Sequence, residues 1–162
     1  MLDGGFAAWV AADRPVASGD VPAGSGTVTI KPGSLPTVDA AEAAALAARG
    51  RLVDVRAPER FRGEVEPMDP VAGHIPGAIN IPTAGNVRSD GAFHTPVLLR
   101  RRFAEADLDV SAEAEPVGVY CGSGVTAAHT VLAMRAAGIP AVLYPGSWSE
   151  WIVDPQRPVA VG

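Results

Sequence analysis

The residues best suited to chemistry in this sequence run from 120 to 126 and read Tyr-Cys-Gly-Ser-Gly-Val-Thr. They contain Cys121, the only cysteine of the chain, and they follow a short apolar run that begins at Val117. We expect this run to be a strand and residues 127–137 to form a helix. A glycine-rich turn between a strand and a helix brings backbone N–H groups together with the helix N-terminus, and both favour negative charge. A thiol placed there loses its proton readily, and the thiolate is the nucleophile.

Three features favour a reactive cysteine over the small buried hydrophobe that an isolated cysteine usually is. Gly122 and Gly124 let the backbone turn its N–H groups inward to form an anion-binding nest. The hydroxyls of Ser123 and Thr126 can donate further hydrogen bonds to sulfur, and Val125 completes this predicted binding loop. The cysteine also comes at the end of a predicted strand, where open α/β sheets place their sites. We call residues 121–126 the cysteine loop.

Several classes of cysteine enzyme can be compared with this loop. Cysteine-dependent phosphatases clamp phosphate with an arginine six positions after the cysteine, and here that position is Ala127. A phosphatase or an arsenate reductase-like enzyme is therefore the weaker alternative. A papain-like protease needs a histidine to activate its cysteine, and we expect His129 to face away from the thiol. A single cysteine excludes a CxxC redox centre.

Other polar and aromatic residues are expected to have structural roles. Asp54 and Arg56 should form an ion pair at a strand end, since buried charges need partners. His74 should hydrogen-bond to the backbone in a tight turn. Trp148 and Trp151 should pack in the core or at a domain interface. The histidines show no metal-ligand spacing, so we expect no metal site.

The elements that must position these residues alternate along the chain in the manner of a parallel α/β sheet. The first is a helix that begins with a capping box at 39–42 and ends at Gly50, and a strand follows at 51–55. An irregular charged loop at 58–73 then leads to a turn and strand at 74–82 and to a helix at 97–104. The last elements are a strand at 116–120, the cysteine loop with its helix, and a strand at 141–144.

Two separated stretches of the chain resemble each other. Residues 2–10 and 144–152 both contain a turn, an aromatic residue, a tryptophan and an apolar residue, and Arg-Pro-Val follows each of them. We therefore expect each stretch to mark the end of a similar domain, so that residues 1–17 are the tail of an upstream copy that this chain lacks. Residues 18–36 are rich in Gly, Pro, Ser and Thr and are expected to be a linker, with a short strand at 27–30.

Composition narrows the function classes. The 162 residues are 48% hydrophobic and 19% charged, which suits one ordinary globular domain with a short extra segment. A formal net charge of −5 without a basic stripe argues against nucleic acid as the main partner. No apolar run is long enough to span a bilayer, and the N-terminus lacks the pattern of a signal peptide. One cysteine cannot form an internal disulfide, so we expect a reducing, cytoplasmic location.

The cysteine loop resembles the active-site loop of the rhodanese superfamily, and more narrowly that of the catalytic second domain of two-domain thiosulfate and 3-mercaptopyruvate sulfurtransferases. Further motifs that match the family in order lie at 53–56, 60–63, 73–80 and 146–148. The resemblance implies that residues 37–162 are a catalytic rhodanese domain. It also implies an α/β fold with a central, mostly parallel sheet that is flanked by helices on both faces.

The resemblance further implies a double-displacement reaction. The Cys121 thiolate would take the outer sulfur of a small-molecule donor and become a persulfide, and the sulfur would then pass to cyanide, thioredoxin or another thiol. The resemblance implies neither an organic cofactor nor a metal. A non-catalytic sulfur-relay or regulatory module that retains the loop is the alternative.

The nature of the sulfur donor stays open between thiosulfate and 3-mercaptopyruvate. Arg60 matches the family arginine that helps bind the carboxylate or sulfonate of the donor. Gly122-Ser123 resembles the loop of mercaptopyruvate-preferring members, whereas thiosulfate-preferring members typically carry Arg-Lys there. A second arginine of the mercaptopyruvate enzymes lies in the loop before Gly73, where this chain has Met68-Asp69-Pro70 instead.

Overall fold

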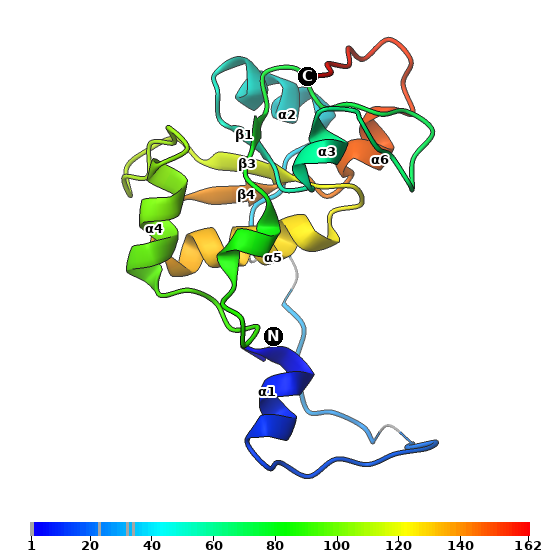
Figure 1. Cartoon of the computed structure of the whole chain (residues 1–162), viewed down its shortest axis with the longest axis vertical. Helices are drawn as coiled ribbons and strands as arrows, with labels where there is room; N and C mark the ends of the chain where they lie inside the picture. The colour runs from blue at the N-terminus through cyan, green and yellow to red at the C-terminus, as the bar shows by residue number, and fades with distance from the viewer. Residues whose placement is uncertain (1, 23, 32, 34) are drawn as a thin grey trace.

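The computed structural model describes residues 2–22, 24–31, 33 and 35–162 (Figure 1). Met1, Ala23, Pro32 and Ser34, which belong to the expected tail and linker, lie outside the described residues. The elements in chain order are α1 (Gly5–Ala11), α2 (Ala40–Ala48), β1 (Leu52–Asp54), α3 (Pro58–Phe61), β2 (Ile79–Asn80), the 3-10 helix η1 (Thr83–Asn86), α4 (Pro96–Ala104), β3 (Val117–Tyr120), α5 (Val125–Ala136), β4 (Ala141–Leu143) and α6 (Ser147–Trp151).

The four strands form one parallel sheet in the order β2-β1-β3-β4. Val119 of β3 pairs with Val53 of β1 on one side and with Leu143 of β4 on the other. The strand that precedes the cysteine loop is therefore central in the sheet. This confirms the predicted α/β fold.

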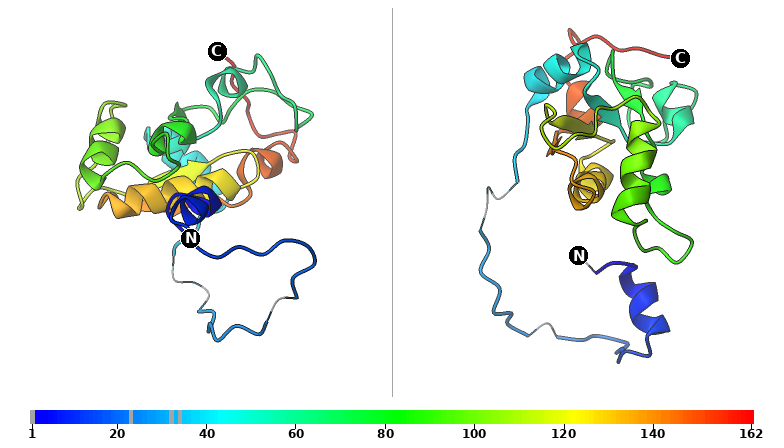
Figure 2. Two further views of the ribbon diagram at one scale, coloured as in Figure 1. Left: turned by 60° about the horizontal axis from the view of Figure 1, so that its bottom comes forward. Right: turned by 90° about the vertical axis from the view of Figure 1, so that its left-hand side faces the viewer.

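Helices cover both faces of the sheet, as Figure 2 shows. Side chains alternate along each strand, so Val53 and Val119 face the core beneath α4 and α5, while Leu52 and Tyr120 face the core beneath α2 and α6. Burial on both faces explains why the strands are mainly apolar, as is usual for parallel sheets, with Asp54 and Asn80 at the last positions of β1 and β2 as the polar exceptions. The two cores fix β3 from both sides, and the chain leaves β3 at Cys121.

Local signals begin and end α2, and end α5, as the sequence predicts, whereas the short helix α3 (Pro58–Phe61) lies in the segment expected to be an irregular loop. Asp39 and Glu42 form a reciprocal capping box at the start of α2, with both hydrogen bonds at 2.9 Å. Gly50 follows the C-cap of α2 with a φ of 66°, and Gly138 follows that of α5 with a φ of 73°. Both glycines therefore adopt the left-handed conformation that commonly ends a helix.

The strand predicted at 27–30 is wrong. The structure has no strand there, and Val28 and Ile30 are 87% and 83% exposed. Four consecutive β-branched residues favour an extended backbone, but a strand also needs a neighbouring strand to pair with its hydrogen-bonding groups. None of the described residues provides such an edge for this segment.

The N-terminal helix α1 lies apart from the sheet and its covering helices (Figures 1 and 2). None of its residues is buried. Its tryptophan nevertheless makes the same contact as the last tryptophan of the chain. Trp9 Nε1 donates to the carbonyl of Pro15 at 2.9 Å, and Trp151 Nε1 donates to the carbonyl of Pro158 at 3.0 Å. The sequence repeat is thus also a repeat of local structure.

Within the described part of the chain, no helix is both long and apolar enough to cross a membrane.

Candidate active site

Cys121 is the first residue after β3 and is 2% exposed. The next three residues turn the chain, and α5 begins at Val125. The turn needs glycine at Gly124, which has a φ of 82° and acts as the N-cap of α5. A Cβ at that position would lie only 2.5 Å from the carbonyl oxygen of Pro145. The close packing of Gly124 against the segment before α6 fixes the path of the cysteine loop.

The N-terminal residues of α6 hold the loop from behind. Trp148 N donates to the Cys121 carbonyl at 3.0 Å. Ser149 N donates to the Gly122 carbonyl at 2.9 Å, and the Ser149 hydroxyl lies 2.8 Å from the same carbonyl and 2.9 Å from Asp69 Oδ1. The first two carbonyls of the loop are thereby satisfied on the side of α6. The backbone amides of residues 122–126 have no hydrogen-bond acceptor among the described residues, as an anion-binding nest requires.

A cavity of about 550 Å³ opens in front of the loop. It is lined by every predicted site residue except Gly124, namely Cys121, Gly122, Ser123, Val125, Thr126 and Arg60. The remaining lining residues are Val55, Arg56, Ala57, Met68, Asp69, Thr83 and Ser149. The structure therefore brings the cysteine, its loop and the predicted donor-binding arginine to one cavity.

Arg60 lies directly over the loop. Its two Nη atoms are within 3.7 Å of the point that a Cβ on Gly122 would occupy. Nε and Nη2 donate to the carboxylate of Glu66 at 3.2 and 2.5 Å, while Nη1 hydrogen-bonds to none of the described residues. One edge of the guanidinium is thus held by the protein. The other edge is available to an anion in the cavity.

Glu66 ties the two arginines of the cavity together. Its side chain is 4% exposed, and it accepts from Arg56 Nη1 at 3.3 Å in addition to Arg60. The backbone amides of Met68 and Asp69 also donate to it, at 3.1 and 3.2 Å. Burial alone would raise the pKa of Glu66, but the hydrogen bonds from Arg60 and from the two amides outweigh burial and lower it. Glu66 is therefore ionised at neutral pH and is held by four hydrogen bonds from Arg60, Met68 and Asp69.

Asp54 and Arg56 form the expected structural pair. Arg56 Nη2 lies 2.7 Å from the Asp54 carboxylate, and both side chains are at most 2% exposed. The guanidinium also donates to the carbonyl of Gly73 and lies over the ring of Trp148, 4.9 Å from its centroid. Burial opposes the charge of Arg56, yet the hydrogen bond and charge of Asp54 raise its pKa above the ordinary value. Arg56 thus supports the wall of the cavity.

The other singled-out residues lie outside the cavity. His74 Nδ1 donates to the carbonyl of Phe61 at 2.7 Å, which confirms its predicted backbone contact. Trp148 and Trp151 are 0% and 3% exposed, and they pack in the core between the sheet, α2 and α6. No group of three metal-ligating side chains is found among the residues that the structure describes. Ala127 is fully buried against the sheet.

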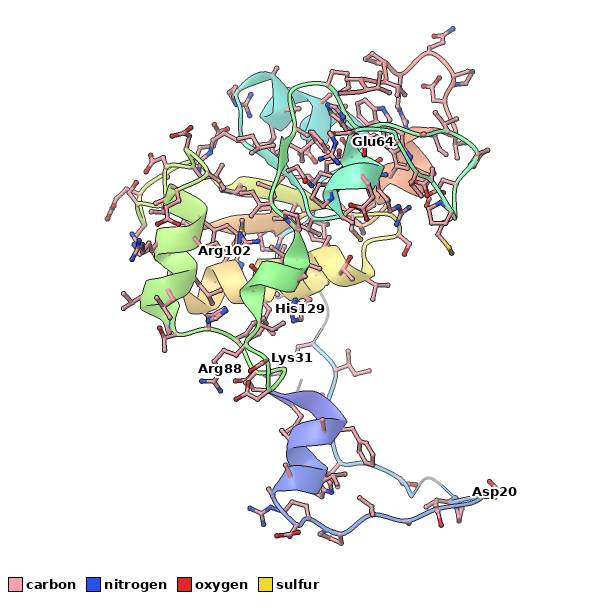
Figure 3. The ribbon with its side chains drawn as sticks, viewed as in Figure 1. Asp20, Lys31, Glu64, Arg88, Arg102 and His129 are labelled. Carbon is pink, nitrogen blue, oxygen red and sulfur yellow. The ribbon has the colours of Figure 1, made fainter. Side chains whose placement is uncertain are left out.

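His129 lies on α5 on the side of the N-terminal segment (Figure 3). Its ring contacts Phe93, with centroids 4.6 Å apart, and its Nδ1 lies 3.2 Å from the hydroxyl of Thr83. Burial lowers the pKa of His129, and the charge of Asp3 opposes that shift in part. The histidine thus reaches the cavity only through Thr83.

Sequence reasoning missed the residues that support the loop. Glu66 and Asp69 belong to the irregular loop that we expected only to be charged, and Ser147 and Ser149 lie on a helix that follows the cysteine by more than twenty residues. The available signal was the Gly-Ser-Trp motif at 146–148. This motif matches the family, but nothing in it indicates which residue of the cysteine loop it contacts.

Comparisons with known proteins agree on one family. The family model described as "Rhodanese-like domain" matches residues 39–154. A probable 3-mercaptopyruvate sulfurtransferase of Pseudomonas aeruginosa is 48% identical and is matched by 100% of this chain, and a putative thiosulfate sulfurtransferase (SseB) of Mycobacterium tuberculosis is 45% identical. The 3-mercaptopyruvate sulfurtransferase of the rat is 38% identical.

The chain spans only part of these relatives. It covers 57% of the length of the Pseudomonas and Mycobacterium proteins and 53% of the rat protein. Among solved structures, an anaerobic ergothioneine biosynthesis enzyme from Chlorobium limicola, in complex with trimethyl histidine, superposes with a TM-score of 0.84. That match covers 99% of this chain and 41% of the enzyme at 24% identity, and it therefore bears on the fold alone. Taken with the cysteine loop and the parallel sheet, the family match shows that this chain belongs to the rhodanese family.

Proposed function

We propose that this chain is a sulfurtransferase that carries sulfane sulfur on Cys121. The observation that supports this most directly is the position of the thiol, at the end of the central strand and in a cavity with free loop amides and one free edge of Arg60. Such a site favours anions. Both the sulfur donor and the persulfide that the cysteine would become are anionic at neutral pH.

The first half-reaction forms a persulfide. With thiosulfate, the Cys121 thiolate attacks the outer sulfur, a sulfur–sulfur bond forms, and the bond to the sulfonate sulfur breaks with release of sulfite. With 3-mercaptopyruvate, the thiolate attacks the thiol sulfur and the carbon–sulfur bond breaks, so that the pyruvate enolate leaves and takes up a proton. In each case the donor sulfur remains on the enzyme as Cys121–S–S⁻.

The second half-reaction returns the thiolate. A nucleophilic acceptor attacks the outer sulfur of the persulfide, and the electron pair of the sulfur–sulfur bond returns to Cys121. Cyanide would give thiocyanate, while thioredoxin or another thiol would take the sulfur as its own persulfide. This cycle uses neither an organic cofactor nor a metal.

The proposed roles of the surrounding residues follow from charge. The amides of Gly122, Ser123, Gly124, Val125 and Thr126 would stabilise the negative charge on the sulfur throughout the cycle. Arg60 would hold the carboxylate or sulfonate of the donor with the edge that Glu66 leaves free. The preference between thiosulfate and 3-mercaptopyruvate would depend on whether these charged groups stabilise a donor with two negative charges or one with a single negative charge.

Mass spectrometry of the intact protein tests the proposal. Incubation of the reduced chain with thiosulfate or 3-mercaptopyruvate should add one sulfur atom, which dithiothreitol or cyanide should remove. Cys121→Ser should show no addition under the same conditions. A wild-type chain that gains no sulfur from either donor would favour the non-catalytic relay or regulatory module. Hydrolysis of aryl phosphates or reduction of arsenate would favour the phosphatase-like class instead.

We also propose the domain organisation and setting. Residues 37–162 would be the catalytic domain, residues 18–36 a linker, and residues 1–17 the end of an upstream rhodanese copy. The matching indole hydrogen bonds of Trp9 and Trp151 support this division. A cytoplasmic location would keep Cys121 reduced, and the acidic composition supports small-molecule and thiol partners over nucleic acid or membrane. Kinetics of this chain beside one extended with an upstream rhodanese domain would test the division.

A further inference from the structure

Asp69 brings a second carboxylate to the cavity. It is one of the lining residues, and its side chain is 12% exposed. Its Oδ2 lies 3.6 Å from Arg60 Nη2, which is too long for a hydrogen bond. Its Oδ1 lies 2.9 Å from the hydroxyl of Ser149, whose single hydrogen is shared between this carboxylate and the Gly122 carbonyl of the cysteine loop. Asp69 is thus fixed between the arginine and the loop.

The charges around the cavity do not balance. Two arginines, Arg56 and Arg60, are in ion-pair contact with three carboxylates, Asp54, Glu66 and Asp69. Asp54 and Arg56 compensate each other at 2.7 Å, and the nearest partner of Arg60 is Glu66 at 2.5 Å. Asp69 is then the carboxylate with the weakest compensation. A donor that approaches Arg60 meets the negative charge of Asp69 in the same place.

We propose that Asp69 is a specificity-determining residue that disfavours dianionic sulfur donors relative to monoanionic ones. The inference rests on the proposed function, because it concerns the donor that Cys121 would attack. Thiosulfate carries two negative charges and 3-mercaptopyruvate carries one when its thiol is protonated. Repulsion from a fixed carboxylate is proportional to the charge of the donor, so thiosulfate is disfavoured about twice as strongly on the free-energy scale.

Asp69→Asn tests this with little change in shape, because the asparagine carbonyl can still accept from Ser149. The value of kcat/KM should rise about 5- to 10-fold for thiosulfate and about 2- to 3-fold for 3-mercaptopyruvate, mainly through KM. Added salt should reduce the difference between wild type and variant, since it screens repulsion in a partly exposed cavity. A purely structural role for Asp69 would change neither the donor ratio nor its salt dependence.

Glu64→Gln is the matched control. It removes one negative charge from the same loop, but the Glu64 side chain is 54% exposed, is paired with Arg62 and does not line the cavity. It should change the donor ratio less than about 1.5-fold. An unchanged donor ratio in Asp69→Asn, or an equal gain with both donors, would overturn the inference while the persulfide still forms. Absence of any persulfide in the wild type would overturn the proposed function itself, and this inference with it.

Discussion

The hydroxyl of Ser147 accepts a hydrogen bond from the backbone N–H of Cys121 at 3.1 Å and donates one to the carbonyl of Tyr144 at 2.9 Å. Ser147 is fully buried and has a φ of 55°, a conformation that residues other than glycine rarely adopt. A strained residue of α6 therefore fixes the main chain of the cysteine. Together with Trp148 and Ser149, it makes α6 the support on which the cysteine loop rests.

Ser147→Ala should lower the free energy of unfolding by about 2 kcal/mol, because the buried N–H of Cys121 loses its acceptor. Ser147→Gly loses the same hydrogen bond but relieves the positive φ, so it should be about 1 kcal/mol more stable than Ser147→Ala. Urea unfolding followed by circular dichroism measures both values. Equal stability of Ser147→Ala and the wild type would show that this hydrogen bond does not hold the loop.

The two glycines of the loop should respond differently to alanine. At Gly124 the new Cβ would meet the Pro145 carbonyl at 2.5 Å with φ at 82°, so Gly124→Ala should cost about 3 kcal/mol. At Gly122 the Cβ would meet only the Arg60 guanidinium, at 3.6 Å, and Gly122→Ala should cost less than about 1 kcal/mol. Unfolding free energies of the two variants test the difference. A Gly122→Ala variant as unstable as Gly124→Ala would contradict it.

Glu66 should make stability depend on pH in the acid range. Its pKa is lower in the folded protein than the ordinary 4.5, so the folded state binds fewer protons there than the unfolded state. The stabilisation is therefore present above about pH 4.5 and is lost as the pH falls through the folded pKa. Glu66→Gln should be about 2 kcal/mol less stable than the wild type at neutral pH, because it leaves Arg56 without one partner and Arg60 without its hydrogen-bonded one.

The difference between the two proteins should shrink as the wild-type carboxylate becomes protonated. Urea unfolding at a series of pH values between about 7 and about 3 measures it. Glu64→Gln serves as the control, since its ion pair with Arg62 is exposed and should contribute little. A gap between wild type and Glu66→Gln that stays constant over this range would mean that the charge of Glu66 is not what stabilises the fold.

The fold and the position of Cys121 at the end of a central strand were predictable because their signals are local. A strand, a glycine turn and a helix around Cys121 are contiguous in sequence, and the parallel pairing of β3 follows from the alternation of helices and strands. The supports were not predictable because they depend on tertiary contacts. The sequence does not distinguish a buried carboxylate such as Glu66 from a solvated one. The separation between Cys121 and Ser147 likewise matches no known motif that would predict their contact. The wrongly predicted strand at 27–30 is the opposite case. Its residues have a high strand propensity, but no neighbouring strand is present among the described residues to pair with them.

The repeated tryptophan contacts predict unequal effects on stability. Trp151 is 3% exposed and belongs to the core with α2, so Trp151→Phe should cost about 2 kcal/mol through lost packing and the lost hydrogen bond to Pro158. Trp9 is 38% exposed on a helix without buried residues, so Trp9→Phe should cost less than about 0.5 kcal/mol despite its matching hydrogen bond to Pro15. Chemical unfolding followed by circular dichroism gives both values. Similar losses of stability in the two variants would mean that α1 folds together with the sheet. A large loss for Trp151→Phe and a small one for Trp9→Phe would mean that α1 is a separate unit, which has the same local hydrogen bond but no hydrophobic core.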